Sequence, residues 1–190
     1  PELSGMEVNT ANYITNILQN IGVDNVIKYS NLGLSAFIGN PNAKIKIGIR
    51  AEMDALPLDE SNKVNYKSCV PGVMHACGHD FHMSLLLAVA QLLKPIEKDL
   101  NFGLKLIFQP SEETLPGGAS VMINEGVLEN PKLDFMLGAH VLPELEVGKF
   151  GFKSAQYMAS GDEIFIEIIG KGGHAAMPEK LNDPVVAAAQ

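Results

Sequence analysis

The chain has 190 residues, of which 46% are hydrophobic and 19% are charged, a balance typical of a soluble globular protein with a sizeable core. Its 14 Lys and Arg against 22 Asp and Glu give a formal net charge of −8, which argues against nucleic acid or an anionic membrane as a partner. The longest apolar run, at residues 85–90, is far shorter than the ~20 residues of a membrane span, and two cysteines, Cys69 and Cys77, indicate a reducing, cytoplasmic location.

Helical and strand patterns alternate along most of the chain. Apolar residues at helical spacing predict helices at residues 5–22, 81–94 and 117–129. Apolar runs and alternating patterns predict strands at residues 35–40, 43–54, 102–110 and 134–141, of which the first two are joined by an Asn-Pro-Asn turn. This alternation predicts an α/β fold in which helices flank a largely parallel sheet.

The composition changes after residue 150. Residues 163–169 alternate strongly and predict a further strand, followed by a glycine-rich turn. Asp183 and Pro184 then form the cap and the first position of a helix that has only begun where the chain stops. We therefore expect one domain over residues 1–155 and the truncated start of a second domain over residues 156–190.

Metal-capable residues follow the expected strands at their carboxyl ends, where ligands collect in open α/β sheets. They are Glu52 and Asp54, Glu112 and Glu113, and His140. A fourth polar segment, "VMHACGHDFH" at residues 73–82, precedes a helix and holds three of the five histidines. Random polar loops would not place such residues so consistently at strand ends.

Each of these features alone has an ordinary structural explanation. Loop histidines often decorate the start of a helix, and a lone cysteine such as Cys77 is more often a small buried hydrophobic residue. Cys77 and His79 supply only two donors, whereas a zinc site needs three or four protein ligands. The adjacent carboxylates Glu112 and Glu113 are informative only if both face a cleft, because like charges repel unless a cation offsets them.

Together these residue types indicate metal-dependent hydrolysis. A bound metal lowers the pKa of water from ~15.7 to about 7, and a neighbouring free carboxylate can act as general base and then as general acid. Thiolate, imidazole and carboxylate donors are compatible with Zn, Mn, Co or Ni. The competing hypothesis, in which Cys77 is a nucleophile with a histidine as base, leaves the glutamate pair and His140 without a role.

Six segments in this order closely resemble the metal-dependent aminoacylase, indole-acetyl-amino-acid hydrolase and hippurate hydrolase family: "IRAEMDALPL", "MHACGHDFH", "FQPSEE", "GGASVMINEGVLE", "GAHV" and "GKGGHAAMP". The resemblance implies an α/β catalytic domain with an inserted α+β satellite domain that commonly mediates dimerisation. It also implies a homodimer that uses two divalent metal ions, Zn or Mn first and Co or Ni as alternatives. The implied reaction releases a carboxylic acid and a free amino acid from a small N-acyl amino acid.

The resemblance also assigns residues by motif. It implies that the metal ligands are Cys77, His79, Glu113 and His140. Glu112 would be the general base, Asp54 would orient or tune the centre, and His174 in the satellite domain would help to bind substrate. His75 and His82 match the motif without an assigned role.

The chain departs from the family pattern at several points. Leu115 and Pro116 stand where many relatives are glycine-rich, and Glu179 stands where a histidine is common. Relatives are much longer and carry a final metal-binding histidine in a C-terminal segment beyond this chain. The sequence is thus expected to be a fragment, and the alternatives to the implied reaction are a metal-dependent dipeptidase and an inactive metal-binding or dimerisation fragment.

Overall fold

The computed structural model describes residues 1–30, 32–162 and 164–190. The chain divides into two compact units, Pro1–Glu144 and Leu145–Gln190, and each is treated by itself. The expected domain ranges, 1–155 and 156–190, stay a prediction. The helices and strands that position the candidate site all belong to the first unit.

The first unit is built on a mixed sheet with the strand order β1-β2-β4-β3-β5. The strands are β1 (Ile27–Lys28), β2 (Leu34–Gly39), β3 (Lys46–Glu52), β4 (Gly103–Gln109) and β5 (Phe135–Gly138). β3 runs parallel to β4 and β5, whereas β2 runs antiparallel to both β1 and β4. The α/β class is therefore confirmed, and the sheet is parallel only over β4, β3 and β5.

The connections set the directions of the strands, and the pairing of β4 sets their order. A short turn at residues 40–45 joins β2 to β3, so the chain reverses its direction there. The longer connection from β3 to β4 contains a helix and keeps these two strands parallel, as parallel neighbours require. β4 pairs with both β2 and β3 and so lies between them, and the two strands expected around the Asn-Pro-Asn turn do not pair with each other.

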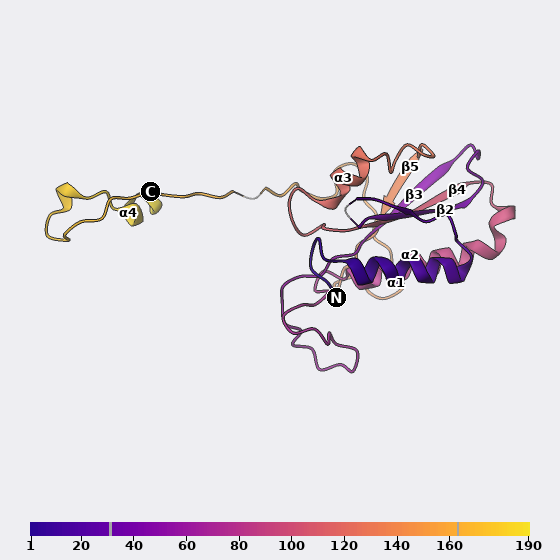
Figure 1. The fold of residues 1–190 in the computed structure, drawn as a ribbon, viewed down its shortest axis with the longest axis horizontal. Helices are drawn as coiled ribbons and strands as arrows, with labels where there is room; N and C mark the ends of the chain where they lie inside the picture. Colours follow the sequence, from indigo (N-terminus) through magenta and orange to yellow (C-terminus); the bar gives the residue numbers. More distant parts are fainter. Residues whose placement is uncertain (31, 163) are drawn as a thin grey trace. The chain divides into compact units, whose positions relative to one another are not determined.

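Helices cover both faces of this sheet (Figure 1). α1 (Val8–Ile21) and α2 (His79–Leu93) lie on one face, and α3 (Gly118–Asn124) lies on the other, with the 3-10 helix η1 (Lys94–Asp99) following α2. α1 ends at Ile21, and the next residue, Gly22, has a left-handed backbone and donates its N–H to the carbonyls of Gln19 and Leu18. α2 begins at His79, two residues before the expected start, so the histidine cluster enters its first turn.

Alternate side chains of β4 enter two hydrophobic clusters. Leu104, Leu106 and Phe108 pack with buried residues of α1 and α2, whereas Ile107 packs with Met122 of α3. Every residue of β4 is buried, as expected for a strand that is covered on both faces. The carboxyl ends of β3 and β4 are thereby held rigidly side by side.

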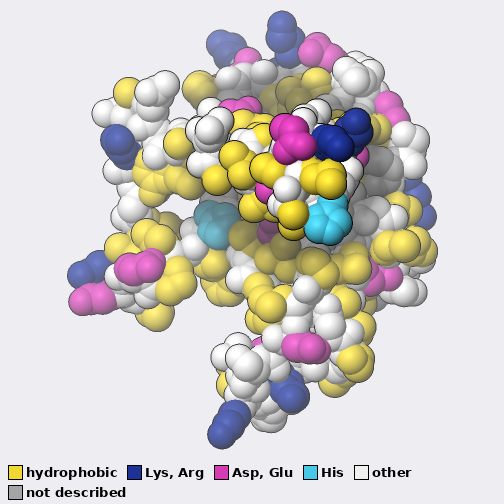
Figure 2. Space-filling model, turned by 90° about the vertical axis from the view of Figure 1, so that its left-hand side faces the viewer, with side chains coloured by type: hydrophobic (Ala, Val, Ile, Leu, Met, Phe, Trp, Pro, Cys, Tyr) yellow, Lys and Arg dark blue, Asp and Glu magenta, His cyan; other side chains and the backbone are white. Residues whose placement is uncertain are grey.

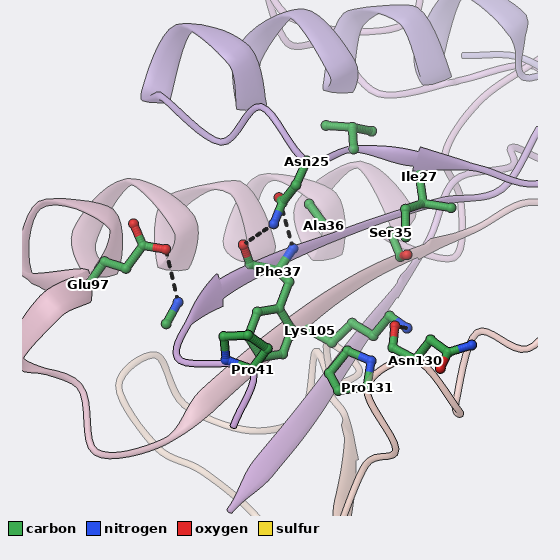
Figure 3. Close-up of a pocket in the computed structure, with 12 residues that line it drawn as sticks. Asn25, Ile27, Ser35, Ala36, Phe37, Pro41, Glu97, Lys105, Asn130 and Pro131 are labelled. Carbon is green, nitrogen blue, oxygen red and sulfur yellow. Dashed lines mark hydrogen bonds between the residues drawn. The ribbon is translucent and has the colours of Figure 1, made fainter. Parts of the chain in front are cut away.

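A pocket of about 420 Å³ lies near the amino-terminal half of β4, away from the carboxyl ends of the parallel strands (Figure 3). Its buried lysine, Lys105, donates to the carbonyls of Val127 and Asn130 at 2.6 and 2.9 Å. The amide group of Asn25 pairs with the backbone of Phe37, which also lines the pocket. These polar groups tie neighbouring segments of the fold together.

The second unit contains the short 3-10 helix η2 (Pro178–Lys180) and α4 (Pro184–Ala188). The predicted helix start is confirmed, since the Asp183 carboxylate accepts from the Val185 N–H at 2.9 Å and Pro184 occupies the first turn. The expected strand at 163–169 is wrong for residues 164–169, and Glu163 lies outside the described residues. A strand needs a neighbouring backbone to complete its hydrogen bonds, and residues 164–169 are not paired with one in the described part of the chain.

None of the helices in the described ranges has the length and apolar composition that crossing a membrane requires. In Figure 2, Lys and Arg side chains appear singly or in small groups among other side chains. Asp and Glu side chains are interspersed among them in the same view, in keeping with the net charge of −8.

Replacing Phe108 with Ala is expected to lower the free energy of unfolding by about 3–5 kcal/mol, because the substitution leaves a cavity under both helices. Phe108 is fully buried, whereas Tyr66 is 83% exposed, so Tyr66→Ala is the matched aromatic control with an expected change near zero. Urea unfolding, monitored by circular dichroism, measures the free energy of unfolding of both variants. Equal effects of the two substitutions would contradict the position of Phe108 in the core.

Candidate metal centre

Four segments that are distant in sequence meet at the carboxyl edge of the parallel strands. Asp54 follows β3, and Glu112 and Glu113 follow β4 in the segment that leads to α3. His140 follows β5, and Cys77 and His79 stand at the start of α2. The sheet thus brings together the six predicted site residues of the first unit.

Three predicted metal ligands form one tight group. Cys77, His79 and Glu113 each present a ligand atom, and these atoms lie within 4.8 Å of one another. His79 Nε2 lies 3.8 Å from Glu113 Oε1 and 3.9 Å from Glu112 Oε2. The fourth predicted ligand, His140, places its Nε2 3.3 Å from Cys77 Sγ.

Asp54 orients two members of this group. His79 Nδ1 donates to the carbonyl oxygen of Asp54 at 2.8 Å and lies 3.3 Å from its carboxylate Oδ1. The other carboxylate oxygen accepts from the Ser4 hydroxyl at 2.6 Å and from the Glu113 N–H at 2.9 Å. Because Nδ1 of His79 carries the hydrogen, its Nε2 lone pair is directed toward the two glutamates.

These contacts also fix the charge of Asp54. Burial alone would raise its pKa, but the hydrogen bonds from His79, Ser4 and the Glu113 backbone lower the pKa well below the usual range. Burial alone would lower the pKa of His79, but its hydrogen bonds with Asp54 raise that pKa above its usual value. Asp54 therefore supplies a permanent negative charge behind the imidazole of His79.

The side chains at the centre fit a cation in both charge and chemistry. The buried Glu113 Oε1 has no hydrogen-bond partner in the described residues. Burial and the carboxylates of Glu113 and Glu112 raise the pKa of the Cys77 thiol to about 11, and burial and Glu113 raise the pKa of Glu112. A divalent cation would relieve this crowding of acidic groups, and thiolate, imidazole and carboxylate donors suit a transition metal.

Two further residues, His82 and Glu52, lie beside this group. The motif left His82 without a role, and Glu52 was not among the residues that it assigned. His82 is one turn along α2 from His79, and Glu52 is the last residue of β3; both are buried. His82 Nδ1 lies 2.8 Å from Glu52 Oε2. The spacing of the two histidines on a helix was a usable sequence signal, but the partner of His82 could not be read from the sequence.

His174, the predicted substrate-binding residue, belongs to the unit Leu145–Gln190. Its Nδ1 accepts from the Ala176 N–H at 3.1 Å within the same glycine-rich segment. This unit is described by itself, so the substrate-binding role of His174 stays a prediction.

In the metal-free chain carrying Cys69→Ser, the rate of Cys77 alkylation by iodoacetamide is expected to rise up to about pH 11, because only the thiolate reacts. The free energy of unfolding should fall between pH 9.0 and about 11, since the unfolded thiol loses its proton before the folded one does. Zn²⁺ at neutral pH should slow the alkylation and release protons. A rate plateau near pH 9 would contradict the placement of the carboxylates around Cys77.

Comparison with known proteins identifies related sequences and structures. Residues 48–190 match the profile of peptidase family M20/M25/M40. The chain is 40% identical over 191 residues to the N-acyl-L-amino acid amidohydrolase of Geobacillus stearothermophilus, and the match covers 100% of the chain and 51% of that protein. It is 42% identical over 188 residues to the hippurate hydrolase of Campylobacter jejuni, with 99% and 48% covered.

A solved structure has a similar fold. The crystal structure of a dinuclear metal-binding peptidase of the M20 family from Bacillus subtilis superposes with a TM-score of 0.74 at 37% identity. The superposition covers 80% of this chain and 42% of that protein. This chain spans about half the length of the curated relatives that it matches.

Proposed function

The chain belongs to peptidase family M20/M25/M40, and on this premise we propose that the protein containing it hydrolyses the amide bond of N-acyl amino acids. The products are a carboxylic acid and a free amino acid. The observation that carries the proposal is the group formed by Cys77, His79 and Glu113, with His140 against the thiol and Glu112 beside it. Two relatives named for such substrates, an N-acyl-L-amino acid amidohydrolase and a hippurate hydrolase, support the substrate class.

Two divalent metal ions, Zn or Mn, are the proposed cofactors, and Cys77, His79, Glu113 and His140 are the ligands that this chain would supply. When bound, such ions polarise the amide carbonyl and make water more acidic. His79 would present Nε2 because Asp54 holds its Nδ1–H. Glu113 would offer its carboxylate while its backbone N–H stays bonded to Asp54.

Glu112 is the proposed general base. Its side chain is 39% exposed, compared with 22% for Glu113, and it therefore has access to water at the edge of the group. Its carboxylate takes one proton from the attacking water as the new C–O bond forms. It then gives this proton to the leaving nitrogen as the C–N bond breaks, which regenerates the carboxylate.

The second unit is proposed to begin a satellite domain that contributes His174 to the binding of the substrate and mediates a homodimer. Light scattering of the whole protein measures its molar mass and so tests whether it is a homodimer. A cytoplasmic location is also proposed, in keeping with the free state of both Cys69 and Cys77.

The reaction is tested on the whole protein with N-acetyl and N-benzoyl amino acids and with dipeptides, by measuring the free amino acid that is released. Treatment with a chelator is expected to abolish turnover, and Zn²⁺ or Mn²⁺ should restore it. Activity that survives the chelator and disappears on alkylation of Cys77 would replace this proposal with a cysteine hydrolase. Hydrolysis of dipeptides alone would replace the substrate class.

A further inference from the structure

We propose that His82 and Glu52 are positioning residues that fix the backbone at Val141 and thereby hold the imidazole of His140 against Cys77. This inference deepens the proposed function and rests on it only in treating His140 as a metal ligand. The contacts that carry it run from β3 through α2 to the segment after β5 and can be followed atom by atom.

Both ring nitrogens of His82 are engaged. The Val141 N–H, which can only donate, lies 3.0 Å from His82 Nε2, so this nitrogen is an acceptor. In the neutral ring the hydrogen is then on Nδ1, where Glu52 Oε2 accepts it at 2.8 Å. The bond to Glu52 thus selects the tautomer that can accept from Val141.

Glu52 is itself held in place. Its second oxygen, Oε1, pairs with the Arg50 guanidinium at 2.6 Å, and only 6% of its side chain is exposed. Although Glu52, His79 and His82 lie close enough to hold a cation, the carboxylate of Glu52 and both nitrogens of His82 are already bonded within the fold. These bonds favour a positioning role for the pair over a separate metal site.

The segment that carries His140 depends on the contact between His82 and the Val141 N–H. β5 ends at Gly138, so His140 and Val141 lie beyond the hydrogen bonds of the sheet, and His140 is exposed. The His82 ring meets the His140 ring edge-on, with centroids 4.8 Å apart. His82 therefore contacts both the imidazole of His140 and the backbone of the next residue.

Val141 is also seated against the segment that bears Cys77. A Cβ atom on Gly78 would lie 2.5 Å from Val141 Cγ2, so the glycine allows this close approach. His140 Nδ1 donates to the Val141 carbonyl at 2.7 Å, which leaves Nε2 directed at Cys77 Sγ, 3.3 Å away. A displacement of Val141 would therefore move His140 away from the thiol.

The test compares His82→Leu with His82→Gln in the whole protein. Leu removes the acceptor for the Val141 N–H, whereas the Gln carbonyl can reach the position of Nε2 and retain it. We expect His82→Leu to weaken metal binding by about 10–100-fold, the usual effect of losing a residue that orients a ligand, and His82→Gln to recover most of that loss. Ser84→Ala, on the exposed side of α2, is the control with unchanged binding.

The readouts are the bound metal per chain in metal-buffered solutions and the absorption of the Co²⁺ form, in which the thiolate band reports Cys77 and the ligand-field bands report the remaining ligands. Unchanged metal affinity and spectrum in a folded His82→Leu variant would overturn the inference. If His82→Leu does not fold, a folded His82→Gln variant whose metal binding is weakened by the whole of about 10–100-fold would equally overturn the inference.

A measurement on the metal-free protein separates this inference from the proposed function. Long-range ¹H–¹⁵N spectra should show His82 with its hydrogen on Nδ1 and the Val141 amide protected from exchange. A hydrogen on Nε2 would refute the positioning role even if the protein hydrolyses N-acyl amino acids. Conversely, a protein without this hydrolytic activity but with the expected tautomer would refute only the proposed reaction.

Discussion

Replacing Glu112 with Gln is expected to lower kcat of the whole protein by about 10²–10⁴-fold and to leave its metal content unchanged. The amide of Gln keeps the shape of the side chain but cannot accept a proton from water. Glu112 does not belong to the group of Cys77, His79 and Glu113, and its nearest approach to His79 Nε2 is 3.9 Å. Its loss should therefore affect proton transfer and not the binding of the ions.

The neighbouring substitution should give the opposite pattern. Glu113→Gln removes a carboxylate whose buried Oε1 has no partner in the described residues, and it is expected to release metal. Glu129→Gln, an exposed carboxylate after α3, is the control that should change neither quantity. Metal analysis and steady-state kinetics are made on all three variants. Near-normal turnover of Glu112→Gln would remove Glu112 from the role of general base.

The position of the site could be predicted from the sequence because the apolar runs show where the strands end. Apolar runs ending at Glu52, at Pro110 and before His140 predict strands, and parallel strands bring their carboxyl ends to one edge. The proximity of Cys77 and His79 to Glu113 then follows from the fold, although the three are separated by more than a helix and a strand. The identity of the ligands came from motif resemblance and not from spacing.

Other features depend on contacts that no local pattern contains. His82 and Glu52 look like an ordinary helix residue and an ordinary strand end until the bond to Val141 is seen. The position of β4 between β2 and β3 depends on how the strands pair across the chain. Residues 164–169 show that an alternating pattern alone does not make a strand when no partner backbone is supplied.

The amino-terminal segment has a role at the centre that the sequence did not indicate. Ser4 donates to Asp54, and the buried Glu7 accepts from the Ser111 N–H at 2.8 Å, one residue before Glu112. Glu2 accepts from the backbone N–H groups at the start of α1 and so fixes this segment to the helix. The residues preceding α1 therefore support the loops that carry Asp54 and the two glutamates.

Asp54 is the residue at which these supports meet, and its replacement by Ala is expected to weaken metal binding by about 10–100-fold and to lower activity at least as much. The substitution removes the acceptor for Ser4 and for the Glu113 N–H, and it leaves His79 bonded only to the backbone carbonyl at position 54. Metal titration and kinetics of the whole protein measure both effects.

Asp54→Asn separates position from charge. The Asn carbonyl can still accept from Ser4 and from the Glu113 N–H, so the loop should stay in place and the metal content should be largely retained. The negative charge behind His79 is lost, however, and the hydrogen bonds that keep the Asp54 pKa low show that this charge is present throughout the physiological pH range. A lower kcat with bound metal in Asp54→Asn, against loss of metal in Asp54→Ala, is the expected contrast. Equal metal loss in both variants would mean that the charge of Asp54, and not its support of the Glu113 loop, governs metal binding; Ser4→Ala, which removes one hydrogen bond and no charge, would then leave metal affinity unchanged.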